Sequence, residues 1–140
     1  MLLFQPSPGQ ISDRMTILQI KIEKSMAQVR GHLLALDSAK IEKTACEAAL
    51  RTYLNTIPIY QVFDFEKLLC KLQAQNRKQW DSEDAVRVAI KECADPPTYD
   101  ELMQVYVAEK PNAEGNQIRA SLVRQIDELF SVAPEVKIYA

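Results

Sequence analysis

The chain reads SPGQISDRMTILQIKI from Ser7 to Ile22, and this stretch indicates a helix with a defined start. Ser7 predicts an N-cap, Gln10 completes a capping box, and Pro8 suits the first helical position. Apolar residues then recur at alternating steps of four and three, at Ile11, Met15, Leu18, Ile22, Val29 and Leu36. This spacing is typical of a coiled-coil seam and predicts one helix over residues 8–36, about 43 Å long.

Further helical patterns follow the first. An alanine-rich pattern covers about 38–56, and another covers about 65–94, with Asp64 as its cap. A second capping box, from Thr98 to Glu101, opens a short helix to about 109, and Pro111 separates it from a last helix that ends near 130. No convincing pair of strands is present. The sequence therefore predicts an all-α fold, an elongated antiparallel helical hairpin or bundle of four to five helices.

Length and composition narrow the class of protein. The 140 residues suit a single helical domain over 1–140, and 47% hydrophobic with 26% charged residues is a globular composition. The formal net charge of -2 argues against a nucleic-acid partner, because such proteins usually need a basic face. The apolar start is too short for a signal peptide, and no later run reaches the ~20 residues of a membrane span. We therefore expect a cytoplasmic protein with no membrane contact.

The three cysteines are expected to be thiols. Cys46, Cys70 and Cys93 are widely spaced, odd in number, and each falls in a helical pattern. Such cysteines are typical of buried thiols rather than of disulfide partners or metal ligands.

One polar interruption in the third helical pattern needs an explanation. Its seam is apolar at both ends, but Asn76, Gln79 and Glu83 occupy the middle. Burying such groups without partners costs on the order of 1–3 kcal/mol each. These turns either face solvent, or form a polar layer that fixes helix register, or line a polar pocket between helices. In the pocket interpretation the ligand-binding candidates are Asp13, Arg14, Asn76, Trp80, Glu83, Asp84 and Arg119.

The sequence also resembles a known family. Residues 7–21 resemble the opening S-P-G-E-x-x-D-(K/R)-x-T-I-L-E-I-K of a family of small bacterial proteins of unknown function. That family carries N-x-x-L-W-x-x-E-D, which matches Asn76, Trp80, Glu83 and Asp84, with Gln79 in place of leucine. It later has a tyrosine followed by N-x-x-R-x-x-x-K-x-x-I-N, which Tyr106, Asn116, Arg119 and Ile126 fit.

The chain departs from that family at several positions. Gln10 and Gln19 replace acidic residues, Val123 replaces a lysine, and Asp127 replaces an asparagine. About seven extra residues, close to two helical turns, lie around 109–115, and their role is not defined by the sequence. The resemblance supplies no reaction. It implies proteins that accompany bacterial surface-polysaccharide and glycosyl-transfer proteins, and its motif residues coincide with the polar candidates.

Several classes of catalytic and metal-binding site require residues that this sequence does not contain. The only histidine, His32, has no acidic residue three positions before it, as a metal-carboxylate bundle would need, and its seam position favours a packed histidine. No nucleophile elbow or Gly-rich phosphate loop is present. Asp81 and Asp84 give only a faint likeness to helical nucleotide pyrophosphohydrolases. We therefore predict no catalytic residue, no metal ligand and no cofactor.

The favoured interpretation is a non-enzymatic helical interaction or accessory module with a protein partner. The alternative is a small-ligand-binding protein or enzyme that uses the polar pocket. Long seams in a short chain leave apolar surface for the monomer to cover, so a homodimer is also expected.

Overall fold

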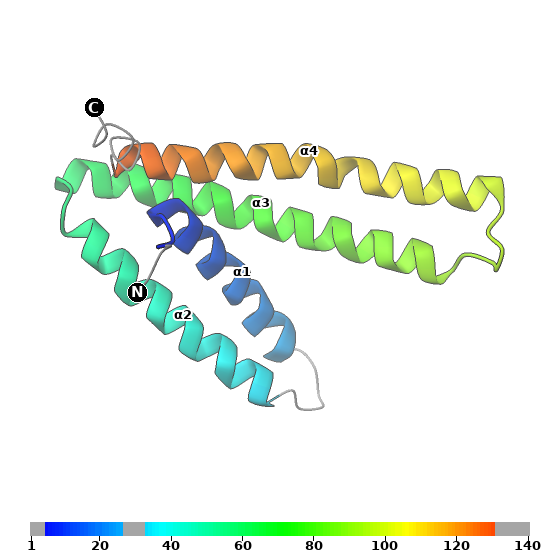
Figure 1. The fold of residues 1–140 in the computed structure, drawn as a ribbon, viewed down its shortest axis with the longest axis horizontal. Helices are drawn as coiled ribbons and strands as arrows, with labels where there is room; N and C mark the ends of the chain where they lie inside the picture. The colour runs from blue at the N-terminus through cyan, green and yellow to red at the C-terminus, as the bar shows by residue number, and fades with distance from the viewer. Residues whose placement is uncertain (1–4, 27–32, 131–140) are drawn as a thin grey trace.

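The computed structural model describes residues 5–26 and 33–130, and there the chain forms four helices (Figure 1). These are α1 (Pro8–Met26), α2 (Leu33–Leu54), α3 (Ile59–Lys91) and α4 (Tyr99–Leu129). The described residues contain no strand, which confirms the predicted all-α class.

The helices form two antiparallel hairpins. α3 and α4 run side by side along their whole length, and at 1.5 Å per residue each is about 50 Å long (Figure 1). α1 and α2 form the shorter hairpin, which crosses the longer one at an angle. α1 packs on both α3 and α4, whereas the main contacts of α2 are with α1. α1 is therefore the helix that joins the two hairpins.

Both predicted capping boxes are confirmed. The Ser7 amide donates to Gln10 Oε1 at 2.9 Å, and the Gln10 amide donates back to Ser7 Oγ at 3.1 Å. At the start of α4 the Glu101 amide donates to Thr98 Oγ1, and the Thr98 amide donates to the Glu101 carboxylate. These local hydrogen bonds satisfy backbone donors that have no partner inside the helix.

The single helix predicted over residues 8–36 is wrong. α1 ends at Met26 and α2 begins at Leu33, so the predicted boundary between residues 36 and 38 lies inside α2. The apolar seam of α1 needs a partner, and α2 folds back to supply it, with Leu18 and Ile22 packed on Ala39. His32 and Val29 lie outside the described residues.

The boundaries of the third helix also differ from the prediction. α3 begins at Ile59 directly after Pro58, which has extended backbone angles and makes no side-chain capping bond. Asp64 is therefore an exposed residue of the second turn and not the cap. The short apolar stretch from Ile59 to Phe63 is the entry to the helix.

The predicted break at Pro111 is wrong as well, because α4 continues through it. The reason is tertiary packing. The less exposed residues of α4 recur every three and four positions and form a seam: Glu101, Val105, Ala108, Asn112, Gly115, Arg119, Leu122 and Ile126. A heptad seam along α3 stabilises the helix on both sides of the proline, which outweighs the one backbone hydrogen bond that proline cannot donate.

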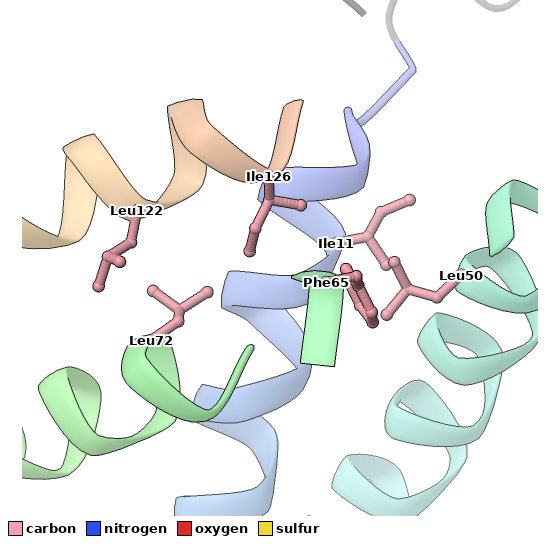
Figure 2. Close-up of a cluster of buried hydrophobic side chains, with 6 residues drawn as sticks. All are labelled: Ile11, Leu50, Phe65, Leu72, Leu122 and Ile126. Carbon is pink, nitrogen blue, oxygen red and sulfur yellow. The ribbon is translucent and has the colours of Figure 1, made fainter. Parts of the chain in front are cut away.

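The main core lies where all four helices meet (Figure 2). Six buried side chains form it: Ile11, Leu50, Phe65, Leu72, Leu122 and Ile126. Phe130 packs edge-on against Phe65 and Tyr53, with ring centroids 5.5 Å and 5.9 Å apart. This core therefore fixes one end of the α3–α4 hairpin only.

The remaining expectations concern thiols and membranes. Cys46 and Cys93 are free and half-buried, but Cys70 is free and exposed, so its predicted burial is wrong. It lies on the side of α3 that no neighbouring helix covers. None of the described helices is long and apolar enough to cross a membrane.

Candidate functional site

Three of the residues predicted for the polar site meet across three helices. Asp13 of α1 accepts hydrogen bonds from Arg119 of α4 on both carboxylate oxygens, the shortest being Nε to Oδ1 at 2.9 Å and Nη2 to Oδ2 at 2.6 Å. Asn76 of α3 donates its amide to Asp13 Oδ1 at 2.9 Å and to Thr16 Oγ1 at 2.7 Å. We call Asp13, Thr16, Asn76 and Arg119 the polar cluster.

The polar cluster is largely shielded from water. Asn76 and Thr16 are 5% and 3% exposed, and the Asp13 side chain is 14% exposed. The hydrogen bonds to Asp13 raise the pKa of the Arg119 guanidinium, although burial opposes this; the charges of Asp13 and Glu83 add to the increase. The two hydrogen bonds make the Asp13–Arg119 ion pair bidentate, the geometry in which such pairs are strongest.

Asp127 positions the start of α1 beside the cluster. Its Oδ1 accepts from the Gly9 amide at 2.7 Å, and its Oδ2 accepts from Ser7 Oγ at 3.0 Å. A Cβ on Gly9 would lie 2.3 Å from the Val123 carbonyl oxygen, so only glycine allows α1 to approach α4 this closely. The sequence analysis noted Asp127 only as a departure from the family and missed this contact.

A second polar contact lies on the other side of Asn76. Gln79 is 5% exposed and donates its amide to Asn116 Oδ1 at 2.6 Å. Gln79 Oε1 and Asn112 Oδ1 are buried and have no hydrogen-bond partner among the described residues. The polar middle of the α3 seam thus packs against a polar stretch of the α4 seam. This contact was not predicted, because a helix break was expected at Pro111.

The other predicted residues do not join the cluster. Arg14 points to α2, where Nη2 donates to Glu42 Oε1 at 3.0 Å. Asp84 pairs within α3, accepting from Arg87 at 2.7 Å. Glu83 is exposed and Trp80 is half-buried. The predicted set therefore divides into a group of three joined by hydrogen bonds, in which Asn76 is buried and the Arg119 side chain is 35% exposed, and separate residues along α3 and α1.

Of the polar cluster, Thr16 lines one cavity along the described helices, and Arg14, from the predicted set, lines another beside Glu42. One of about 330 Å³ opens between α1, α2 and α3, and its walls include Thr16, Gln19, Lys43, Glu47 and Gln73. A smaller one of about 70 Å³ lies beside Gln79 and Gly115, between α3 and α4. Neither is lined by Trp80, Asn76 or Glu83. Within residues 5–26 and 33–130, no group of three or more His, Cys, Asp or Glu side chains is placed to hold a metal ion.

The chemistry of the polar cluster follows from this pairing. Both oxygens of Asp13 accept hydrogen bonds, and the Thr16 hydroxyl donates to the Asp13 carbonyl at 2.8 Å while accepting from Asn76. Each of these groups is engaged by a neighbour in the same chain. The cluster as built links α1, α3 and α4.

The far end of the α3–α4 hairpin has a different character. Along α3 the last ion pair with α1 joins Lys24 to Asp81, at 3.9 Å, and on α4 the matching link is Arg119 with Asp13. Residues 82–112 lie beyond both, and we call them the distal arm. Figure 1 shows this arm extending past α1 and α2 with no described helix over it.

The distal arm is rich in exposed apolar side chains. Thirteen large hydrophobic side chains are exposed among the described residues, and the arm contains seven: Val88, Ile90, Tyr99, Leu102, Met103, Tyr106 and Val107. Exposed apolar clusters on a folded protein commonly mark interaction sites. This surface was not predicted, because its apolar residues lie outside the seams and only tertiary packing determines whether another helix covers them.

Comparison of the chain with known protein families, with curated proteins and with solved structures finds no match in any of the three. No relative therefore supplies a residue role or an activity. The function has to be argued from the polar cluster, the cavities and the distal arm.

Proposed function

We propose that this chain is a helical protein–protein interaction module whose docking surface is the distal arm. The observation that carries the proposal is the exposure of seven large apolar side chains on a segment that no described helix covers. Removing such side chains from water is worth about 25 cal/mol per Å² of apolar surface, so a partner that covers them gains binding free energy.

The state of the polar cluster supports the same proposal. Hydrogen bonds join Asp13 to both Asn76 and Arg119. In this proposal these contacts hold α1 on the α3–α4 hairpin. A small-ligand site usually presents a few polar groups that converge on an open cavity. The polar cluster and the four-helix core would then stabilise the fold, and the distal arm would bind the partner.

The family resemblance suggests a setting for such a module. An accessory role beside enzymes of bacterial surface-polysaccharide synthesis would need a docking surface and no catalytic residue of its own. We include that setting in the proposal as the context in which a partner should be sought.

Site-specific photo-cross-linking tests the proposal. We expect p-benzoylphenylalanine in place of Tyr106, on the arm, to form defined protein adducts in the cells that naturally produce the chain. The same photoreactive residue in place of Thr52, exposed on α2, should not form them. Adducts of equal yield at both positions, or none at Tyr106, would contradict the proposal.

The cavity between α1, α2 and α3 favours a second candidate function, the binding of a small ligand. Its volume of about 330 Å³ lies within the range of small-molecule sites, and Lys43, Glu47 and Gln73 supply polar groups. A thermal-shift screen of sugar nucleotides, phosphates and divalent metals tests it. A compound that stabilises the wild type but not Gln73→Phe, whose ring would fill the cavity, supports this candidate, and the absence of any such compound counts against it.

A further inference from the structure

We propose that the distal arm binds a basic amphipathic helix of a partner protein, with the apolar stripe of that helix on α4 and its lysine or arginine residues beside the arm's carboxylates. This inference rests on the proposed function, because it names the chemistry of the partner that the arm would take.

The apolar part of the surface has helical geometry. Tyr99, Leu102, Met103 and Tyr106 follow the spacing i, i+3, i+4, i+7, so they share the outer face of α4, and they are between 41% and 75% exposed. Val107 extends the face by one further position. The opposite face of the same turns, with Val105 and Ala108 half-buried, packs toward α3. These turns of α4 are therefore apolar on both sides, which a helix facing only water would not need.

A hollow also lies between α3 and α4 in the arm, away from the four residues of this outer face, and it leaves room for side chains. A cavity of about 330 Å³ lies between the ends of α3 and α4, and small residues, Ala85 and Ala89, form part of its wall together with Val88. The carboxylates of Glu92 and Glu101 also line it. A shallow apolar hollow with acidic walls suits the aliphatic stem and charged end of a lysine or arginine side chain.

The charge of the arm decides the chemistry of the partner. Seven acidic residues lie in residues 82–112 against three basic ones, Arg87, Lys91 and Lys110, while the whole chain has a net charge of only -2. Of these seven carboxylates, only Asp84 forms an ion pair with a described residue. The backbone amides of Thr98 and Ala94 donate to Glu101 and lower its pKa, so this carboxylate stays ionised. An acidic rim around an apolar face attracts basic partners and repels acidic ones.

The same charge disfavours a second copy of the chain as the occupant. Two arms placed face to face would bring two acidic rims together, and like charges across an interface weaken it. A basic amphipathic helix meets both requirements at once, since its apolar stripe covers the exposed face and its cations neutralise the rim.

A peptide titration tests the inference on the full-length protein. The probe is a fluorescent amphipathic peptide of about five helical turns made of leucine and lysine, with leucine at the i, i+3, i+4, i+7 positions. Its control is the same peptide with glutamate in place of every lysine. We expect fluorescence anisotropy to show binding of the lysine peptide, affinity that falls as salt rises, and at least tenfold weaker binding of the glutamate peptide.

Matched variants locate the binding. Leu102→Ser with Tyr106→Ser should lower the affinity for the lysine peptide at least tenfold. Ile59→Ser with Tyr60→Ser removes two side chains that are at least as exposed, at 74% and 64%, but lie at the other end of the hairpin, and should change the affinity less than twofold. Circular dichroism melting of each variant shows whether it is folded. Asp100→Asn with Glu109→Gln, on the exposed rim, should weaken binding and reduce its salt dependence.

The outcomes separate the inference from the proposed function. Equal binding of both peptides, or binding that the arm variant leaves unchanged, overturns the inference. If the lysine peptide does not bind while Tyr106 cross-links to a partner protein, the proposed interaction module is supported, but the proposed basic amphipathic character of the partner is wrong. An adduct at Tyr106 with twice the chain's mass of 15.9 kDa would identify a second copy as the occupant and also overturn the inference.

Discussion

At the scale of single residues, two glycines lie in close helix contacts, and they should differ in their response to substitution. In Gly9→Ala the new Cβ meets the backbone oxygen of Val123 at 2.3 Å, so α1 has to move away from α4. We expect a loss of about 1–3 kcal/mol in the free energy of unfolding, the usual cost of overpacking.

The matched control is Gly115→Ala. There the nearest contact, at 2.8 Å, is with the amide end of the flexible Gln75 side chain. The next, at 2.9 Å, is with Cγ of the buried Gln79, so side chains and no backbone atom have to shift. Alanine also favours a helix by about 1 kcal/mol over glycine, so we expect stability within about 1 kcal/mol of the wild type. Urea unfolding followed by the fluorescence of Trp80, the only tryptophan, measures both variants. A Gly9→Ala protein as stable as Gly115→Ala would mean that α1 and α4 are not in such close contact.

The ion pair between Glu23 and Arg77 predicts a dependence of stability on pH. Hydrogen bonds from Arg77 and Gln19 lower the pKa of Glu23 from 4.5 to about 2. A carboxyl group with a lowered pKa in the folded state stabilises it fully above pH 4.5, and this contribution disappears as the pH falls toward 2. The pair ties α1 to α3.

Glu23→Gln isolates that effect. Melting temperatures should be lower for the variant than for the wild type at neutral pH, and the difference should shrink steadily between pH 4.5 and 2. A difference that stays constant over this interval would mean that Glu23 has an ordinary pKa in the folded protein.

The residues of the polar cluster were only partly predictable. The interrupted seam pointed to Asn76, and the list of charged candidates contained Asp13 and Arg119, because periodicity shows which positions face other helices. Arg14 was in that list too, yet it faces α2, since adjacent residues of a helix point in directions about 100° apart. Thr16 and Asp127 were missed because small polar side chains on a helix have many ordinary roles, and a sequence alone does not reveal their distant partners.

At the scale of helices, α4 contains a proline in its interior, which leads to the next prediction. Pro111 has no amide proton to donate, and proline inside a helix costs about 3 kcal/mol or more relative to other residues. Because α4 nevertheless continues through Pro111, we expect Pro111→Ala to raise the free energy of unfolding by about 1–3 kcal/mol.

Amide hydrogen exchange gives a local measurement of the same change. Protection of residues 99–112 should increase in Pro111→Ala, while protection around the core residue Leu122 should follow global stability. Lower protection of the arm in the variant would contradict the continuous helix and favour a functional bend at the proline.

The presence of a helix in each part of the chain was more predictable than the residues at which each helix begins and ends. The two capping boxes located the starts of α1 and α4, because each depends on residues only three positions apart. The separation of α1 from α2 between Met26 and Leu33 was not predicted, since the apolar spacing from Ile11 to Leu36 is compatible with one long helix or with two shorter ones. The choice depends on which helix covers the seam, and that is a tertiary contact.

At the scale of the whole molecule, the two hairpins are joined mainly through α1. Its contacts with α3 and α4 include the core residue Ile11, the close approach at Gly9 and the polar cluster. This arrangement leaves the distal arm uncovered, which no local pattern in the sequence could have shown. The central claim is that the polar cluster holds this assembly together and is not a ligand site.

The free energy of unfolding of Asn76→Leu, measured by urea titration, tests that claim most directly. If Asn76 is a structural link, leucine removes its two hydrogen bonds to the shielded side chains of Asp13 and Thr16, so stability should fall by about 1–3 kcal/mol. Gln73→Leu, half-buried one turn earlier on α3, serves as the control and should change stability by less than about 0.5 kcal/mol. A residue kept for ligand binding behaves in the opposite way, since removing it commonly stabilises the protein. An Asn76→Leu protein more stable than the wild type would contradict the structural role and return the polar cluster to the list of binding sites.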